Sequence, residues 1–191
     1  RSRTGIPELD EMLRGGLMQG DATMVAGSAG SGKTTLGLQY LVNGIIEFGE
    51  NGIFVTFEEL PDQVYRDANN FGWDLRKLET EGRLKVICTS PNLLLETDGG
   101  KGLLDDPISK VNAKRIVVDS LSHIAMYVDD KELRKEAYRL MMYLKTKGLN
   151  SILLWESPQL VGQGLSITGM GLSFLVDCIL LLKYVEVESR M

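Results

Sequence analysis

Two kinds of segment, each with its own spacing of apolar residues, follow one another along this chain. Short continuous runs rich in Val, Ile and Leu predict buried strands, at residues 22–27, 52–57, 83–89, 115–120, 151–155 and 178–187. Longer segments carry apolar residues three or four positions apart and predict helices, at residues 33–48, 61–71, 73–81 and 133–147. Alternation of this kind is typical of a parallel sheet covered by helices on both faces. We therefore expect an α/β fold.

One long stretch follows neither pattern. Residues 90–107, SPNLLLETDGGKGLLDDP, are rich in Gly and Asp, so we expect a partly ordered loop there. We find no internal repeat and no low-complexity tract. A chain of 191 residues is long enough for one domain with a sizeable core. We therefore expect a single domain over residues 1–191.

Composition and charge narrow the class of protein. The net charge of −5 gives no general attraction to nucleic acid or anionic lipid. The longest apolar run, residues 178–185, contains Lys183 and is too short to span a bilayer. The first residues lack the apolar stretch of a secretory signal. We expect a cytoplasmic protein in which Cys88 and Cys178 are buried thiols.

A glycine-rich segment carries the clearest chemistry. GSAGSGKT, at residues 27–34, matches the P-loop pattern G-x-x-x-x-G-K-[ST] between a predicted strand and a predicted helix. Its glycines let backbone N–H groups approach phosphate oxygens, and the helix N-terminus adds partial positive charge. We expect Lys33 to reach the β- and γ-phosphates and Thr34 to ligate Mg²⁺. The predicted nucleotide-binding residues are Gly27, Ser28, Ala29, Gly30, Ser31, Gly32, Lys33, Thr34 and Thr35.

Carboxylates follow two of the predicted strands. A P-loop site needs a carboxylate at the tip of a neighbouring apolar strand, where it holds the Mg²⁺ shell. Asp119, at the end of the run RIVVD, is the candidate for this carboxylate. Glu58 and Glu59 follow IFVTF, and a regular strand would aim only one of them at the γ-phosphate. A carboxylate there could orient and deprotonate the attacking water, and a second would raise its pKa. The pair could equally form an acidic entry to the helix that begins at Pro61.

Two further polar residues follow predicted strands. For His123, the only histidine, a hydrogen-bonded structural role is favoured over catalysis. Glu156 in WESPQ lies at the tip of a predicted strand, where a polar side chain could sense the γ-phosphate. A solvated turn is the favoured reading of Glu156.

The chain resembles the KaiC family of RecA-superfamily ATPases. The resemblance is carried by TGIPELDEMLRGGLMQGD (4–21), NGIIEFGENGIFVTFEELPDQVYRDANNFGWDL (43–75) and SITGMGLSFLVDCILLLKYVE (166–186). It implies a RecA-like P-loop fold of three layers, α/β/α, in which the middle layer is a mostly parallel sheet. It also implies Mg²⁺-dependent ATP hydrolysis in a homo-oligomeric, hexameric ring with nucleotide, as ATP or ADP, at the subunit interface.

The resemblance also assigns roles to residues. It implies that Glu58 is the general base, that Glu59 assists it, and that Lys33 takes part in catalysis. It places Asn70 and Phe71 beside the nucleotide base, where the ring could stack on adenine. From pattern alone, a core position on an amphipathic helix is an equal alternative for Phe71.

The chain also departs from the family pattern. Arg190 matches a family arginine near the nucleotide only across a gap in residues 186–190. The chain ends before the strand that would carry the family's Lys and Arg fingers, so we expect a domain without that strand and with weaker stabilisation of transition-state charge. Ser173 and Phe174 stand where the family's phosphorylated domain has a Ser-Thr pair, which puts autokinase activity in doubt.

Three functions compete on this basis. A KaiC-type ATPase with a regulatory or signal-transducing role leads. The missing finger strand favours a nucleotide-switched oligomeric scaffold with little turnover. A RecA-like DNA recombinase is disfavoured, because residues 157–171 carry no Lys or Arg and DNA phosphates need cations to neutralise them. We expect a protein partner of unknown identity, and no nucleic-acid partner.

Overall fold

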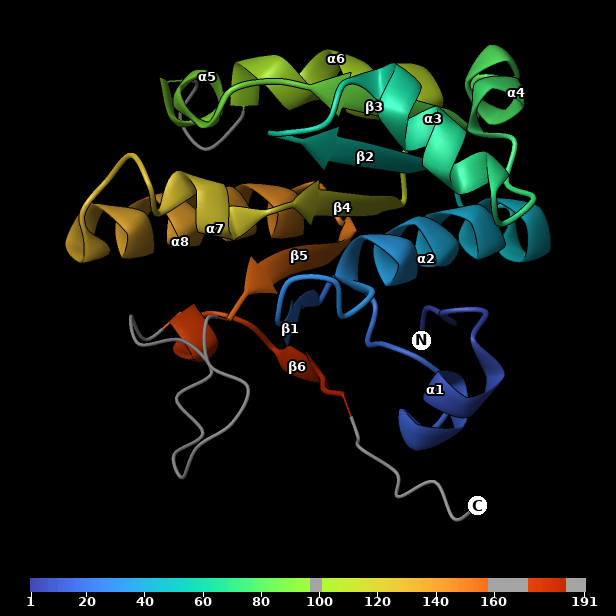
Figure 1. Cartoon of the computed structure of the whole chain (residues 1–191), viewed down its shortest axis with the longest axis horizontal. Helices are drawn as coiled ribbons and strands as arrows, with labels where there is room; N and C mark the ends of the chain where they lie inside the picture. The colour runs from blue at the N-terminus through green and yellow to red at the C-terminus, as the bar shows by residue number, and fades with distance from the viewer. Residues whose placement is uncertain (97–100, 158–171, 185–191) are drawn as a thin grey trace, which may run out of the picture.

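Six parallel strands form the central sheet of the protein (Figure 1). A computed structural model describes residues 1–96, 101–157 and 172–184. The strand order is β3-β2-β4-β5-β1-β6, and every pairing between these strands is parallel. The strands are β1 (Ala22–Gly27), β2 (Gly52–Thr56), β3 (Leu84–Cys88), β4 (Arg115–Asp119), β5 (Asn150–Glu156) and β6 (Cys178–Leu182). The expected parallel sheet is therefore confirmed.

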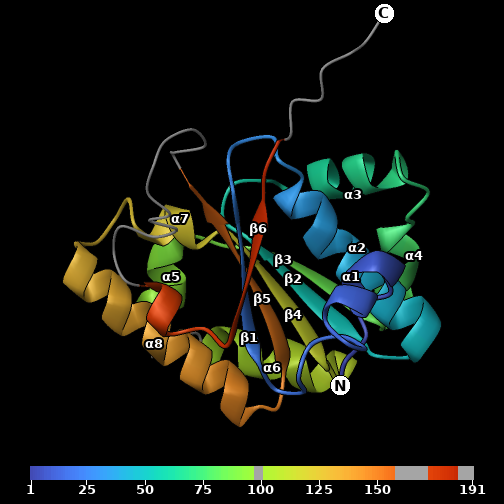
Figure 2. The ribbon, with the colours of Figure 1, turned by 90° about the horizontal axis from the view of Figure 1, so that it is seen from below.

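Helices cover both faces of this sheet (Figure 2). One face packs against α2 (Lys33–Phe48), α3 (Pro61–Asn69) and α4 (Leu75–Thr80), with α1 (Pro7–Met12) on the same side. The other face packs against α5 (Pro91–Glu96), α6 (Lys101–Val111), α7 (Leu121–Ile124) and α8 (Asp130–Thr146). A short 3-10 turn, η1 (Leu172–Phe174), precedes β6. Two clusters of buried apolar side chains, one on each face, hold the three layers together. The expected three-layer α/β/α fold is confirmed.

Most of the predicted elements are present, and apart from the end of β6 their ends shift by no more than three residues. The helix expected at 133–147 begins earlier, at Asp130, because the Asp129 carboxylate accepts hydrogen bonds from the N–H groups of Lys131 and Glu132. Such a cap satisfies donors that have no partner within the helix. The strand expected at 178–187 is β6 over its first five residues, and residues 185–187 lie outside the described part.

The loop expected over residues 90–107 is wrong, because this stretch contains α5 and the first part of α6. Pro107 lies inside α6, where a proline removes one backbone donor. Leu94 and Leu104 are 1% and 0% exposed, and both belong to the core on the α7–α8 face. Burial of these leucines stabilises the helices against the local preference of Gly, Asp and Pro.

The expected burial of both thiols is also wrong. Cys88 is exposed and Cys178 is partly exposed, and both are free. Cys88 ends β3 and Cys178 begins β6, and these two strands form the edges of the sheet, where fewer neighbours cover a side chain. No helix among the described residues has the length and hydropathy needed to cross a membrane.

Candidate functional site

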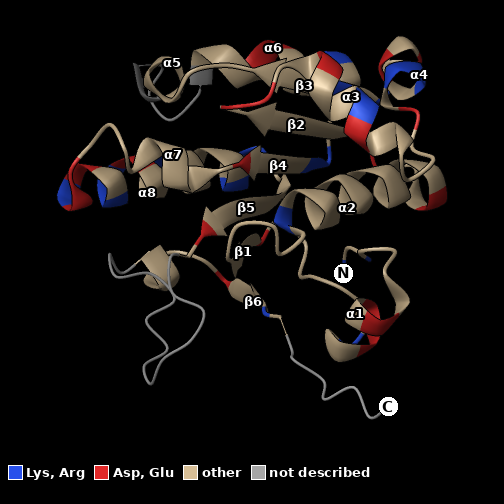
Figure 3. Cartoon of the chain, viewed as in Figure 1, with Lys and Arg blue, Asp and Glu red and all other residues tan. Residues whose placement is uncertain are grey.

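The candidate site lies where the carboxyl ends of four parallel strands meet. A pocket of about 290 Å³ opens at the ends of β1, β2, β4 and β5, the edge at which ligands bind in open α/β sheets. Figure 3 shows acidic residues at the tips of β4 and β5 and a basic residue at the start of α2. The pocket is lined by Ala29, Gly30, Gly32, Lys33, Thr34, Thr35, Thr56, Glu58, Glu59, Asp119, Ser120, His123 and Glu156. The structure therefore gathers most of the sequence-predicted residues in one place.

The loop between β1 and α2 has a backbone that requires glycine. Gly30 and Gly32 have φ angles of 72° and 88°, in the left-handed region that strains other residues. A Cβ added at Gly27 would lie 2.4 Å from Ser31 Oγ and 2.9 Å from the carbonyl oxygen of Leu182. These three positions explain why glycine recurs in the loop.

The side chain of Lys33 contacts the backbone of the same loop. Its side chain is almost completely buried, and Nζ donates to the carbonyl oxygens of Ser28 at 2.6 Å and Gly27 at 3.1 Å. Glu156 Oε2 lies 3.8 Å from Nζ. The hydroxyl oxygens of Ser28 and Ser31 are buried and find no hydrogen-bond partner in the described part of the chain. A buried ammonium, two unpaired hydroxyls and the N-terminus of a sixteen-residue helix together fit an anion.

Thr34 and Asp119 form the oxygen-rich side of the pocket. Thr34 Oγ1 donates to Asp119 Oδ2 at 2.6 Å. Asp119 was expected on a strand next to β1, but β5 lies between β1 and β4, so the contact spans two strand spacings. The hydroxyl and the carboxylate are hard oxygen donors of the kind that suit Mg²⁺. Among the described residues, no group of three or more His, Cys, Asp or Glu side chains is arranged so that it could hold a metal ion by itself.

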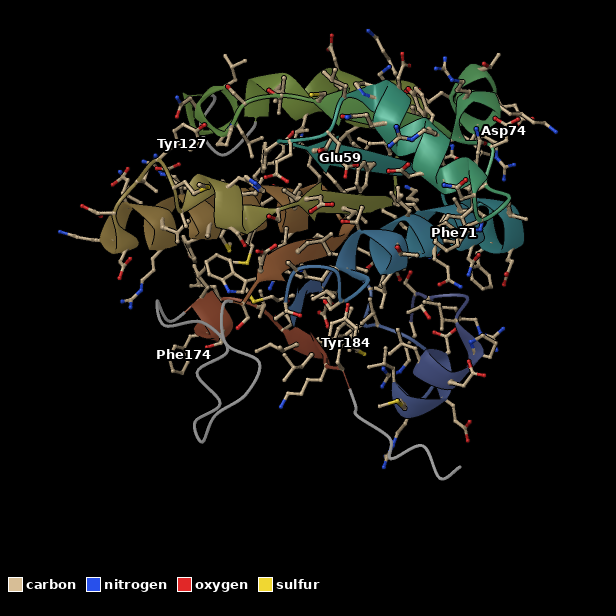
Figure 4. The ribbon with its side chains drawn as sticks, in the orientation of Figure 1. Glu59, Phe71, Asp74, Tyr127, Phe174 and Tyr184 are labelled. Carbon is tan, nitrogen blue, oxygen red and sulfur yellow. The ribbon has the colours of Figure 1, made fainter. Side chains whose placement is uncertain are left out.

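Glu58 and Glu59 both line the pocket, although consecutive strand residues were expected to point to opposite faces. The reason is that β2 ends at Thr56, and both glutamates lie in the bend that follows. The Thr56 hydroxyl accepts the N–H groups of Glu58 at 3.4 Å and Glu59 at 3.1 Å. Figure 4 shows Glu59 between β2 and β4. The bend, and not the strand, presents the pair.

The two glutamates differ in their surroundings. Glu59 is half-buried, and its pKa is raised by burial first and then by the negative charges of Asp119, Asp67 and Glu58. The sequence analysis expected a neighbouring carboxylate to raise a glutamate pKa; at Glu59, Glu58 does so, but burial, Asp119 and Asp67 have larger effects. The side chain of Glu58 is 66% exposed, and its Oε1 is hydrogen-bonded to Nε2 of His123.

Two of the predicted residues, Asn70 and Phe71, lie away from this pocket. Asn70 and Phe71 follow α3 and are absent from the pocket lining, and Figure 4 shows Phe71 beside α2, well to the right of Glu59. Phe71 is 57% exposed and stacks on Trp73 with ring centroids 4.9 Å apart, so the core alternative is wrong. Arg190 lies outside the described residues.

Sequence reasoning missed one contact to the loop. The hydroxyl of Tyr184, just beyond β6, donates to the carbonyl oxygen of Gly30. The two residues are 154 positions apart, and only the pairing of β6 with β1 brings them together. An aromatic residue directly after an apolar strand was the one available signal.

Asp119 carries an electrostatic cost that can be measured. Burial raises its pKa above the ordinary 3.8, and the hydrogen bond from Thr34 and the positive charge of Lys33 oppose this only in part. An acid with a raised folded-state pKa binds more protons when folded, so its cost to stability is present at neutral pH and fades as pH falls through that pKa. Asp119→Asn keeps an acceptor for Thr34. We expect it to increase the free energy of unfolding by about 0.5–2 kcal/mol at pH 7.

Urea denaturation at pH 7 and at pH 4 checks this expectation, because the gain should shrink at the lower pH. Asp106→Asn is the matched control, since the Asp106 side chain is 85% exposed and should give no pH-dependent gain. A loss of stability for Asp119→Asn at pH 7, or an equal gain at both pH values, would contradict the argument.

Comparison with known proteins matches nearly the whole chain to one family. The protein-family model described as "ATPase: KaiC" matches residues 2–191. The chain is 39% identical over 164 residues to the "Circadian clock oscillator protein KaiC" of Synechococcus elongatus, covering 82% of this chain and 32% of that protein. It is 37% identical over 201 residues to the protein of the same name in Prochlorococcus marinus subsp. pastoris, covering 98% and 38%.

A third relative, the "Circadian clock protein KaiC3" of Synechocystis sp., is 34% identical over 197 residues, covering 98% of this chain and 38% of that protein. The chain spans about a third of the length of these curated relatives. The family match extends over almost every residue, including the glycine-rich loop and the acidic strand ends described above. The chain therefore belongs to the KaiC family of ATPases.

Proposed function

We propose that this chain binds a magnesium-bound nucleoside triphosphate, ATP in the first place, and hydrolyses its γ-phosphate in a regulatory or signal-transducing role. One observation carries the proposal. A single pocket combines the buried Lys33 ammonium, the Thr34–Asp119 pair and two glutamates. Anion, metal and water-activating groups in one pocket are the parts that phosphoryl transfer to water needs. The family to which the chain belongs supports the same reading.

The glycine-rich loop would hold the phosphates. Its backbone N–H groups and the N-terminus of α2 would bind oxygens of the β- and γ-phosphates. Lys33 would exchange its two loop carbonyl partners for phosphate oxygens, and the free hydroxyls of Ser28 and Ser31 would gain acceptors. Thr34 and Asp119 would hold Mg²⁺, directly or through water, and bound Mg²⁺ neutralises charge on the phosphates.

The paired glutamates would act on the attacking water. Glu58, the more exposed of the two, would orient a water molecule toward the γ-phosphorus and accept its proton. The new bond joins the water oxygen to phosphorus, and the bond to the bridging oxygen of the leaving diphosphate breaks. Glu59 would assist through its charge. This division of roles follows the family resemblance.

Several finer expectations stay predictions. Contact of Asn70 and Phe71 with the nucleotide base is one of them, because neither residue lines the described pocket. The placement of Arg190 near the nucleotide is a second, because Arg190 lies outside the described residues. A homo-hexameric ring with nucleotide between subunits is another, and so is a cytoplasmic location.

The proposal is tested by titrating the protein with ATP in a calorimeter, with Mg²⁺ and with EDTA, and by following phosphate release from the same samples. We expect binding with Mg²⁺, weaker binding with EDTA and measurable release only with Mg²⁺. Native mass measurement of these samples reports the expected ring. An absence of heat with both ATP and GTP would overturn the proposal.

A further inference from the structure

A chain of hydrogen bonds links Glu58 to the end of β4. His123 Nε2 is hydrogen-bonded to Glu58 Oε1, and His123 Nδ1 lies 3.0 Å from Ser120 Oγ. Ser120 directly follows Asp119 and precedes α7, which carries His123. All three side chains line the pocket. The imidazole thus connects the bend after β2 to the tip of β4 inside the candidate site.

The chemistry of Glu58 and Ser120 determines which atoms donate in the two hydrogen bonds of His123. An ionised Glu58 carboxylate can only accept a hydrogen bond, so Nε2 of His123 carries a proton. In a neutral imidazole the other nitrogen is then an acceptor, and the Ser120 hydroxyl donates to Nδ1. Ser120 is 4% exposed, so its hydroxyl is held in place by the surrounding structure. Ser120 therefore orients the ring, and the ring orients Glu58.

His123 lies at the pocket, whereas other residues of α7 form its part of the apolar core. The apolar contacts of α7 come from Leu121 and Ile124, each 1% exposed, which lie in the core. The His123 side chain is 21% exposed and lies at the pocket wall. Both hydrogen bonds of the ring go to residues of the pocket, Ser120 and Glu58, so its polar contacts belong to the site.

We propose that His123 is a positioning residue for Glu58, an inference that rests on the proposed function of Glu58 as the general base. Glu58 is 66% exposed at a bend, so without a partner its side chain would sample several rotamers. The bond to Nε2 holds Oε1 and leaves Oε2, which has no hydrogen bond within the described residues, free to face water. The same N–H offsets the repulsion of Glu58 by Glu59 and Asp119.

The test compares steady-state hydrolysis of Mg-ATP by the wild type, His123→Ala and His123→Gln. Loss of positioning in His123→Ala should lower kcat about 10–100-fold, with KM and the ATP dissociation constant unchanged. The amide nitrogen of glutamine can donate near the place of Nε2, so His123→Gln should recover part of kcat. In a Glu58→Gln background, His123→Ala should have no further effect, because the group that it positions is gone.

Met126→Ala is the matched control, because Met126 is 79% exposed just beyond α7 and should keep wild-type kcat. A wild-type kcat for His123→Ala, in a protein that Glu58→Gln inactivates, would overturn this inference and leave the proposed function intact. The inference also fails if His123→Ala lowers kcat equally in both backgrounds, or if His123→Gln recovers nothing. A wild type without hydrolysis would overturn the inference and the proposed function together.

Discussion

Replacement of Lys33 by methionine is expected to weaken ATP binding at least about 100-fold and to lower hydrolysis about 10³-fold or more. The reason is that Lys33 is the almost completely buried ammonium whose Nζ lies over the glycine-rich loop. A hydrogen bond to a charged group is worth about 1.5–3 kcal/mol, and Lys33 is placed to make two. Methionine keeps much of the apolar stem, so loss of charge should dominate over loss of packing.

Calorimetric titration with Mg-ATP and a phosphate-release assay measure both effects. Lys114→Met is the matched control. Lys114 is exposed and directly precedes β4, so it lies at the amino end of that strand, whereas the pocket lies at the carboxyl ends. It should leave both quantities within about twofold of the wild type. Unchanged ATP affinity in Lys33→Met, with the fold intact, would place the phosphates elsewhere.

The sequence was most informative where a site residue belongs to a local motif. The glycine-rich loop, Lys33 and Thr34 are contiguous, and the strand and the helix on either side of them begin and end where their apolar patterns predict. Asp119 was predictable because it follows an uninterrupted apolar run that proved to be a buried strand. The backbone conformation of the loop and the periodicity of a strand both depend on residues that are close together in the sequence, so both can be predicted from it.

The sequence was least informative where packing joins distant segments. His123 and Glu58 are 65 positions apart, and their contact depends on β2 pairing with β4. In the bend that turns both glutamates into the pocket, the Thr56 hydroxyl accepts the N–H groups of both, and no periodicity reveals these contacts. The burial of Leu94 and Leu104 likewise outweighs local signals for a loop. These features follow from tertiary contacts, which a single sequence does not specify.

The roles of the two glutamates are separable by single substitutions. Glu58→Gln is expected to lower kcat for ATP hydrolysis about 10²–10⁴-fold while ATP still binds, because an amide cannot accept the proton of the attacking water. Glu59→Gln should have a smaller effect, about tenfold, since it removes a nearby charge and not the base. Single-turnover phosphate release measures both rates, and Glu8→Gln, at an exposed glutamate of α1, is the control.

A larger loss of kcat in Glu59→Gln than in Glu58→Gln would identify Glu59 as the general base. Glu59 is the glutamate whose pKa is raised, by burial and by the charge of Asp119, and a raised pKa makes a carboxylate a stronger base once it is ionised. Glu58 is the more exposed and is held by His123. If Glu59→Gln abolished release and Glu58→Gln did not, the base would be Glu59. His123 would then position only a neighbouring charge, because its hydrogen bond goes to the residue that does not receive the proton.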